Sequence, residues 1–150
     1  MSKRLEVFKY APEAYKGFAA VKSYVQTCGL PATLVELVYL RVSLINGCAY
    51  CIDMHTRDLV NQGVKIDKVA LLPVWAEAAA LFTDQERAAL AWAESVTRVA
   101  ETTVPDADYQ RALAVFSEQQ LANLTVAIAL MNSFNRFGVA MRIPPAALAM

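Results

Sequence analysis

The residues best suited to chemistry lie together in residues 36–59, ELVYLRVSLINGCAYCIDMHTRDL. This stretch holds the one histidine of the sequence, His55, and two of its three cysteines. Cys48 and Cys51 form a C-x-x-C, and His55 follows Cys51 by four residues. Glu36 precedes Cys48 by twelve residues. Two thiols that can close a disulfide, beside an imidazole and a carboxylate that can move protons, indicate a thiol redox site.

The cysteine pair is expected at the start of a helix. After the helix-breaking pair Asn46-Gly47, residues 48–62 contain no Gly or Pro and are followed by Gly63, which is typical of one helix with a glycine stop. In the first turn of a helix, the unpaired N–H groups and the positive end of the macrodipole lower the pKa of a thiol. His55 lies one helical turn after Cys51, roughly 6 Å along the axis, so its imidazole can reach the Cys51 sulfur directly or through one water. A thiolate near a base, with a second thiol three residues away, has the parts needed to reduce a peroxide and to be recycled.

Two physical arguments disagree about which cysteine is the nucleophile. Stabilisation by the helix N-terminus, and exposure, usually favour the first cysteine of a C-x-x-C, here Cys48. The turn-spaced His55 instead favours Cys51, because a base in reach can take its proton. The residues themselves leave both alternatives open.

Length and composition limit the class of protein. A chain of 150 residues fits one domain, residues 1–150, with a sizeable core. Lys+Arg and Asp+Glu number 14 each, so the zero net charge gives no indication of a nucleic-acid or anionic-membrane surface. Glu6 and Lys9 interrupt the apolar character of the start, and no apolar run approaches 18 residues, so we expect neither signal peptide nor membrane span. We therefore expect a cytoplasmic protein, and three cysteines with one left over do not resemble a secreted disulfide framework.

Helical patterns run through the whole chain, and no convincing period-2 strand interrupts them, so the predicted fold class is all-α. The expected helices span residues 12–28, 31–45, 48–62, 66–82 with a break at Pro73, 84–100, 106–116 and 118–137. Thr83 with Glu86, and Ser117 with Gln120, have the capping-box pattern. The tail, residues 139–150, is expected to be extended. The hydrophobic fraction of 57% is high for a chain of this length, which favours a homo-oligomer.

Glu36, Cys48-x-x-Cys51 and His55 resemble the core of the AhpD-like alkylhydroperoxidases within the carboxymuconolactone decarboxylase family. The downstream segments ERAALAWAESVT and FNRFGVAMRIPP resemble the same family, so the resemblance covers most of the chain. It implies an all-helical AhpD-like bundle assembled as a trimer or hexamer, with peroxidase activity and an external dithiol or disulfide reductant protein as partner. It also implies roles for the four residues. Cys51 would be peroxidatic and Cys48 resolving, with Glu36 and His55 as a proton relay through water, and without a cofactor or a metal.

The sequence departs from that family pattern at Tyr50. Characterised peroxidases of the group have a second histidine immediately before the second cysteine, and Tyr50 stands there. This departure favours an alternative function, a thiol-disulfide adaptor or oxidative-stress sensor without efficient peroxidase turnover. The decarboxylase branch of the family lacks the cysteine pair, so the pair argues against lactone decarboxylation. A third alternative is a metal site of Cys48, Cys51 and His55, which would need Cys28 as its fourth ligand.

Several residues also have simpler explanations. Thr33 and Glu36 are spaced as a capping box, which would make Glu36 a helix-capping residue. The cysteine pair could be a structural disulfide or inert, and His55 a packed histidine. Simple structural roles are expected for Cys28 as a small buried residue, Asp53 and Asp58 on solvated faces, and Trp75 and Trp92 as core or interface anchors. Asn132, Asn135 and Arg136 stand out in an apolar helix, and they line either the site or an interface.

Overall fold

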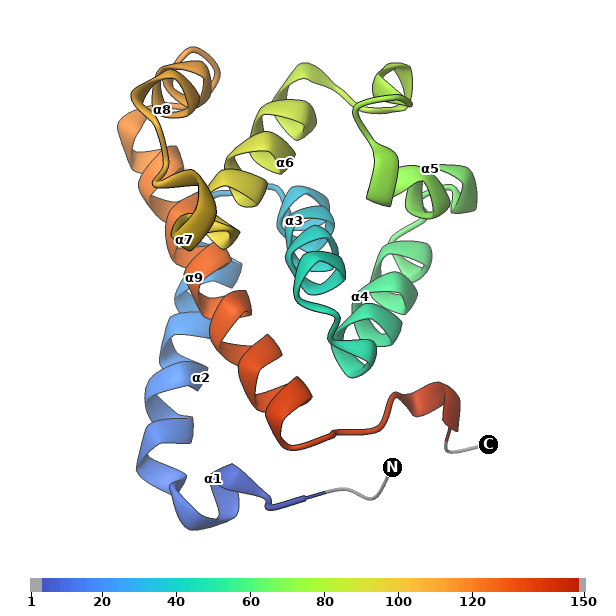
Figure 1. Ribbon diagram of the computed structural model, residues 1–150, viewed down its shortest axis with the longest axis vertical. Coiled ribbons are helices and arrows are strands. Elements are labelled where there is room, and N and C mark those ends of the chain that lie inside the picture. Colours follow the sequence, from blue (N-terminus) through green and yellow to red (C-terminus); the bar gives the residue numbers. More distant parts are fainter. Residues whose placement is uncertain (1–3, 149–150) are drawn as a thin grey trace.

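The computed structural model describes residues 4–148, and these form helices and no strand, which confirms the predicted all-α class (Figure 1). The α-helices are α1 (Val7–Tyr10), α2 (Pro12–Thr27), α3 (Ala32–Asn46), α4 (Ala49–Asn61), α5 (Ile66–Leu71), α6 (Asp84–Thr97), α7 (Val99–Thr102), α8 (Asp106–Leu113) and α9 (Glu118–Ala140). Short 3-10 helices are η1 (Leu72–Val74), η2 (Ala79–Leu81) and η3 (Ala146–Leu148). The expected domain of residues 1–150 includes residues 1–3 and 149–150, which lie outside the described part.

The expected break at Pro73 is confirmed, but the second part of the helix predicted over residues 66–82 is wrong. α5 ends at Leu71, and Pro73 lies within the 3-10 helix η1. Proline has no N–H to donate and its ring clashes with the preceding turn, so an α-helix does not continue through it. A turn and η2 follow, and Phe82 is extended before α6 begins. This segment therefore folds as a compact loop instead of a second α-helix.

Both predicted capping boxes are confirmed. The Thr83 hydroxyl accepts a hydrogen bond from the Glu86 N–H at 3.2 Å, and the Ser117 hydroxyl accepts one from the Gln120 N–H at 3.2 Å. In each box the second side chain accepts from the N–H of the first residue. These caps satisfy N–H groups that a helix start leaves unpaired, and they fix where α6 and α9 begin.

The ends of three other helices differ from the sequence expectation. The segment 84–100 divides into α6 and α7 at Arg98, whose backbone leaves helical geometry (ψ 34°), and α8 ends at Leu113 instead of residue 116. α9 runs through Gly138 to Ala140, so the expected end at residue 137 is too early. The tail is not uniformly extended, because η3 forms within it. A glycine inside a helix is tolerated where close packing requires it, and Gly138 of α9 is such a residue.

α3 is the central helix, and α4, α6 and α9 all pack against it (Figure 1). Eight of its 15 residues are buried, as expected for a helix that is apolar on most of its faces. One core cluster joins α2, α3, α6 and α9 and includes Trp92, and a second joins α3 and α4 to the loop after α5, with Trp75 packed against it. Both tryptophans therefore anchor the core. Each fully buried large apolar side chain contributes about 1.5–3 kcal/mol to folding.

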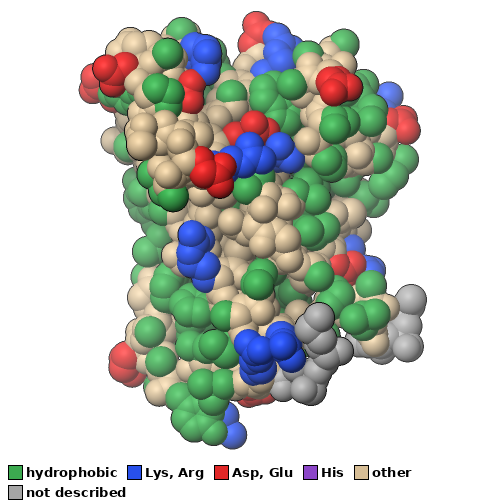
Figure 2. All heavy atoms as spheres, in the orientation of Figure 1, with side chains coloured by type: hydrophobic (Ala, Val, Ile, Leu, Met, Phe, Trp, Pro, Cys, Tyr) green, Lys and Arg blue, Asp and Glu red, His purple; other side chains and the backbone are tan. Residues whose placement is uncertain are grey.

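The surface of the described chain mixes apolar and charged side chains, and Figure 2 shows apolar groups spread over the visible face between Lys, Arg, Asp and Glu. Within residues 4–148, no helix combines the length and the apolar character needed to cross a membrane.

The central helix α3 also carries polar side chains that lie inside the protein. Glu36 and Ser43 are two of these, and both take part in the site described next.

Candidate active site

The cysteine pair lies at the tight turn between α3 and α4. Gly47 caps α3 with φ of 66°, a left-handed conformation that glycine adopts without steric cost. Cys48 follows in extended conformation and is the N-cap residue of α4, and its N–H donates to the Ser43 carbonyl at 3.1 Å. Cys51 then lies in the first turn of α4. The sequence prediction that both cysteines stand at a helix start is confirmed.

Both cysteines are free thiols and both are buried, with 1% of Cys48 and 3% of Cys51 exposed. The Cys51 N–H donates to the Cys48 sulfur at 3.4 Å. The sulfur thus occupies the position that a serine or aspartate oxygen holds at most helix starts. The Cys48 sulfur therefore contacts the Cys51 backbone before any oxidation.

The two thiols differ in acidity. A hydrogen bond from the Cys51 side chain is the main influence that lowers the pKa of Cys48 from 9.0 to about 7, and N–H groups of the first turn add to it against the opposing effect of burial. The same hydrogen bond, followed by burial and the Cys48 charge, raises the pKa of Cys51. The first proton to leave the pair is therefore that of Cys48, and the Cys51 thiol then donates to the resulting thiolate.

Glu36 and His55 form a hydrogen-bonded pair between α3 and α4. His55 Nδ1 lies 2.7 Å from Glu36 Oε2, and the side chains are only 4% and 19% exposed. A carboxylate only accepts hydrogen bonds, so Nδ1 carries a proton, which leaves Nε2 as the ring nitrogen that can exchange a proton with another group. Of the buried side-chain nitrogen and oxygen atoms in the described chain, only His55 Nε2 has no hydrogen-bond partner. A buried base without a partner is suited to act on a thiol or a small substrate.

Two neighbours define the surroundings of this pair. The Tyr39 ring packs 5.2 Å from the His55 ring, centroid to centroid, and restricts its orientation. Burial, and next the charge of Glu36, raise the pKa of Tyr39, so its hydroxyl stays protonated. The capping-box alternative for Glu36 is wrong, since Pro31 is the N-cap of α3 and Thr33 donates its hydroxyl to Gln62 at 3.1 Å. Glu36 is therefore free to bind the histidine.

The metal-site alternative gains no support from the cysteines. Among residues 4–148, Glu36, His55 and Asp58 are the one set of potential ligands whose donor atoms all lie within 4.8 Å of one another, and neither thiol belongs to it. Asp58 thus lies beside the Glu36–His55 pair. Cys28 is half-buried at the end of α2, and its thiol donates to the Val25 carbonyl. Asp53 is also half-buried, and it accepts hydrogen bonds from Arg57 and from the Ala147 N–H.

The polar residues of α9 divide between the site and its margin. Asn135 is fully buried, accepts a hydrogen bond from Asn46 at 2.9 Å and donates one to Ser43 at 3.0 Å. Its NH₂ group also donates to the Met131 sulfur at 3.4 Å, and its presence lowers the pKa of both cysteines. Asn132 bonds Asn46 as well, and Arg136 is exposed and bonds back to Asn132. Asn135 therefore belongs to the thiol site, a role for which the sequence signal was only its polarity in an apolar helix.

Gly138 is a second site residue that sequence reasoning missed. A Cβ atom at this position would lie 2.5 Å from the Cys48 sulfur and 3.6 Å from the Cys51 sulfur. The α9 backbone thus passes directly against the thiol pair, which any larger residue would prevent. Glycine inside a helical pattern was the available signal, since such a residue often marks a close approach.

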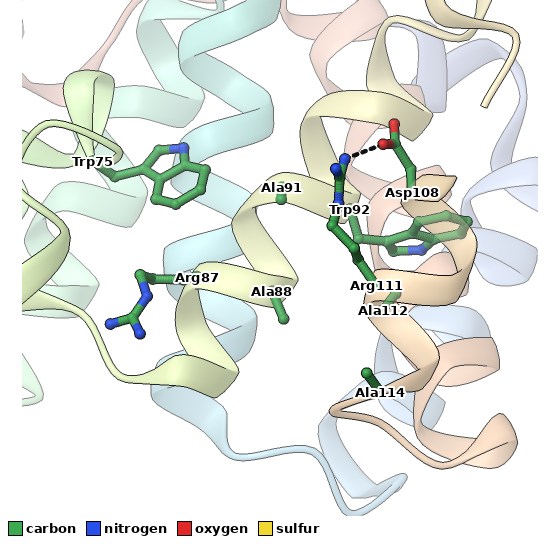
Figure 3. A pocket seen from close by; sticks show the side chains of 9 residues that line it. All are labelled: Trp75, Arg87, Ala88, Ala91, Trp92, Asp108, Arg111, Ala112 and Ala114. Atoms are coloured by element: carbon green, nitrogen blue, oxygen red, sulfur yellow. Dashed lines mark hydrogen bonds and ion pairs between the residues drawn. The ribbon is translucent and has the colours of Figure 1, made fainter. Parts of the chain in front are cut away.

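A hollow of the described chain lies elsewhere, between α6 and α8 (Figure 3). It has a volume of about 570 Å³ and is lined by Trp75, Trp92 and small alanines, with charged groups at its edge. Arg111 pairs with Asp108 beside the Trp92 indole, and Arg87 donates to backbone carbonyls and to Asp84. None of the thiol-site residues lines this hollow.

Comparison with known proteins identifies the family. Residues 12–95 match the model of the carboxymuconolactone decarboxylase family. The uncharacterized protein YdfG of Bacillus subtilis is 36% identical over 141 residues, 94% of this chain and 95% of its own. A solved structure from Agrobacterium tumefaciens is that of a protein of unknown function, proposed to be the antioxidant-defence protein AhpD. It is 39% identical in sequence, and the match covers 96% of this chain and 98% of the Agrobacterium chain with a TM-score of 0.91. An uncharacterized peroxidase-related protein from Ralstonia eutropha shares the fold at 20% identity and a TM-score of 0.79, covering 93% of this chain and 74% of its own.

Proposed function

The chain belongs to the carboxymuconolactone decarboxylase family, and we propose that it is an AhpD-like thiol peroxidase that reduces hydroperoxides through a Cys48–Cys51 disulfide. The observation that carries the proposal is the Glu36–His55 pair, which joins α3 to the helix that begins at the cysteines and leaves the second imidazole nitrogen as a base. A lactone decarboxylase would have no use for two close thiols of unequal acidity. The relative from Agrobacterium, which matches nearly the whole chain, is itself proposed to serve antioxidant defence.

The proposed first step uses Cys51 as the nucleophile. His55 Nε2, directly or through one water, takes the proton of the Cys51 thiol, and Glu36 stabilises the resulting imidazolium through Nδ1–H. The Cys51 thiolate attacks the terminal oxygen of the hydroperoxide, so a sulfur–oxygen bond forms and the oxygen–oxygen bond breaks. The leaving alkoxide takes the proton back from His55 and departs as the alcohol. Cys51 is then a sulfenic acid.

The second step uses the thiolate that the resting pair already carries. The Cys48 thiolate attacks the Cys51 sulfur and closes the disulfide, and hydroxide leaves and takes one proton from solvent to become water. The two sulfurs together have given two electrons to the peroxide. An external dithiol, small or on a reductant protein, returns them by thiol-disulfide exchange. The low pKa of Cys48 suits it to this resolving role, because it is ionised without needing a base of its own.

Burial of the thiols favours a small substrate. With only 1% and 3% of the two cysteines exposed, a hydroperoxide can approach the sulfurs more easily than a protein disulfide can. The second candidate, a thiol-disulfide adaptor or oxidative-stress sensor, is favoured by Tyr50, which supplies no base beside Cys51 where related peroxidases have a histidine. Catalytic consumption of peroxide separates the two, since an adaptor exchanges disulfides with partners and consumes peroxide no faster than a free thiol does.

The assembly is part of the proposal. Large apolar side chains exposed on the single chain, such as Tyr10, Ile66 and Val99, are 70%, 62% and 56% accessible, which supports burial between copies of the chain. We expect a homo-oligomer, a trimer or a hexamer, working in the reducing cytoplasm. The mass of the reduced protein in light scattering after gel filtration checks this, and a purely monomeric protein would contradict it.

Trapping the intermediate tests the mechanism. In Cys48→Ser the resolving thiol is gone, so one equivalent of peroxide should leave a sulfenic acid on Cys51, detectable as a dimedone adduct by mass spectrometry. Cys51→Ser should form no adduct at residue 48 and should not turn over peroxide. An adduct on Cys48 in Cys51→Ser, formed as fast as that on Cys51 in Cys48→Ser, would reverse the assignment of the two cysteines.

A further inference from the structure

The segment after α9, residues 141–148, connects the two helices that meet at the thiol pair, and we call it the strap. At its near end, the Ile143 N–H donates to the carbonyl of Gly138, the residue at which a Cβ would meet both sulfurs. At its far end, the Ala147 N–H donates to Asp53 Oδ2 at 3.1 Å, and Asp53 lies in α4 two residues after the second cysteine. Figure 1 shows this segment running from the end of α9 past the start of α4. The strap therefore bridges the two sides of the thiol site.

The thiol pair must become accessible during the proposed reaction. Cys48 and Cys51 are 1% and 3% exposed, yet a hydroperoxide and then an external dithiol must each come within bonding distance of a sulfur. Part of the surroundings therefore has to move. The helices α3 and α9 contribute many residues to the buried core clusters, so moving either of them as a whole would disrupt the core.

The strap has the features of a segment that opens locally. Met141, Ile143 and Pro145 are half-buried, and its other residues are exposed. Segments with few buried contacts and exposed backbone hydrogen bonds open at the lowest free energy. Arg142 has φ of 53°, the left-handed conformation that glycine usually supplies after the end of a helix. An arginine is strained in this conformation, so the closed strap opens more easily than one with glycine at this position.

Opening of the strap reaches the sulfurs through the last turn of α9. The hydrogen bond from the Ile143 N–H to the Gly138 carbonyl, 3.0 Å long, closes that turn. Without it the turn frays, and Gly138 is no longer held against the Cys48 sulfur. Asp53 opposes this opening, because its carboxylate holds the other end of the strap on α4 through a charge-assisted hydrogen bond.

From these contacts we propose that Asp53 and the strap form a clasp that selects, by size, the molecules that reach the thiol pair. The closed clasp admits a molecule as small as hydrogen peroxide. The open clasp admits a bulky organic hydroperoxide and the external dithiol. Asp53 thereby determines specificity without touching a reacting atom. The inference deepens the proposed function, on which it rests for its role in catalysis.

The test measures the accessibility of the thiol pair without using a peroxide. In Cys28→Ser the pair holds the two remaining thiols, and their reaction with the bulky aromatic disulfide DTNB is followed by the absorbance of the thiolate that it releases. Asp53→Ala, added to this protein, removes the acceptor of the Ala147 N–H and should speed the reaction by about fivefold or more. Ala147→Pro removes the donor instead, with no change of charge, and should have the same effect. Hydrogen exchange of the Ile143 amide should be faster in both variants, which locates the opening at the strap.

Arg57→Ala is the matched control. It removes the other partner of Asp53, which donates from 2.9 Å, and leaves the hydrogen bond to the strap in place. The thiols of this variant should react with DTNB as fast as those of the parent protein. Unchanged reactivity in both Asp53→Ala and Ala147→Pro, or an equal gain in Arg57→Ala, overturns the clasp.

A second measurement tests the selection by size. In Asp53→Ala the rate of oxidation by an organic hydroperoxide should rise relative to the rate with hydrogen peroxide, and an unchanged ratio refutes the selection. Labelling by DTNB and hydrogen exchange need no peroxide. Faster labelling in a protein that reduces no hydroperoxide would therefore keep the clasp and refute the proposed function instead.

Discussion

Gly138→Ala should destabilise the reduced protein even though alanine is the better helix former. In a helix interior the substitution by itself favours folding by about 0.5–1 kcal/mol. The new Cβ, however, would stand 2.5 Å from the Cys48 sulfur, more than 1 Å inside an ordinary contact of about 3.5–4.0 Å, so either α9 or the sulfur must move. Overpacking of this kind costs about 1–3 kcal/mol. Moving the sulfur would also weaken the hydrogen bond that it accepts from the Cys51 N–H.

Gly17→Ala provides the comparison. Gly17 lies inside α2, and a Cβ there would meet nothing within 4 Å, so only the gain in helix propensity remains. We expect Gly17→Ala to be at least as stable as the parent protein and Gly138→Ala to be about 1–3 kcal/mol less stable than Gly17→Ala, measured by urea unfolding with the thiols reduced. Peroxide consumption should fall in Gly138→Ala alone. If the two variants gained the same stability, α9 would not press against the cysteines, and the site as described would be refuted.

Three further predictions concern the proposed Glu36–His55 relay, the pKa of Cys48, and Thr33, which does not cap α3. His55→Gln and Glu36→Gln should each slow the first oxidation by about 10²-fold or more if they act as base and partner, and an unchanged rate in His55→Gln would remove the relay. Because the folded-state pKa of Cys48, about 7, lies below its ordinary value of 9.0, the reduced protein should gain about 1–2 kcal/mol of stability as pH rises from 7 to 9 and lose it as pH falls through 7. Urea unfolding against pH checks this, and Cys48→Ser should not show the gain. Thr33→Ala should change stability by less than about 0.5 kcal/mol, whereas loss of a true capping box would cost about 1 kcal/mol.

The elements that carry local signals could be predicted from the sequence. Gly47, the cysteine spacing and Gly63 define α4, and the two capping boxes define the starts of α6 and α9, because each signal acts within a few residues. His55 could be placed on the face of Cys51 for the same reason. That Glu36 is the partner of His55 came from the family resemblance, since the local pattern of Thr33 and Glu36 suggested a cap instead.

The parts that were missed depend on contacts between distant segments. Asn135 and Gly138 look like an odd polar residue and a helix stop until α9 is packed on the α3–α4 turn, where one meets Ser43 and the other meets the Cys48 sulfur. No local sequence pattern predicts such a contact. The prediction for the segment after Pro73 was wrong for a related reason. Its alanine-rich sequence favours a helix, but its packing against the second core cluster holds it as a loop.

The measurement that tests the central claim most directly is stopped-flow oxidation of the pre-reduced protein by hydrogen peroxide and by an organic hydroperoxide, followed by tryptophan fluorescence, with free thiols counted afterwards. The account predicts fast, saturable loss of two thiols per chain, joined as the Cys48–Cys51 disulfide, and its disappearance in Cys51→Ser. Oxidation no faster than that of an ordinary free thiol would contradict the account and favour the adaptor or sensor function.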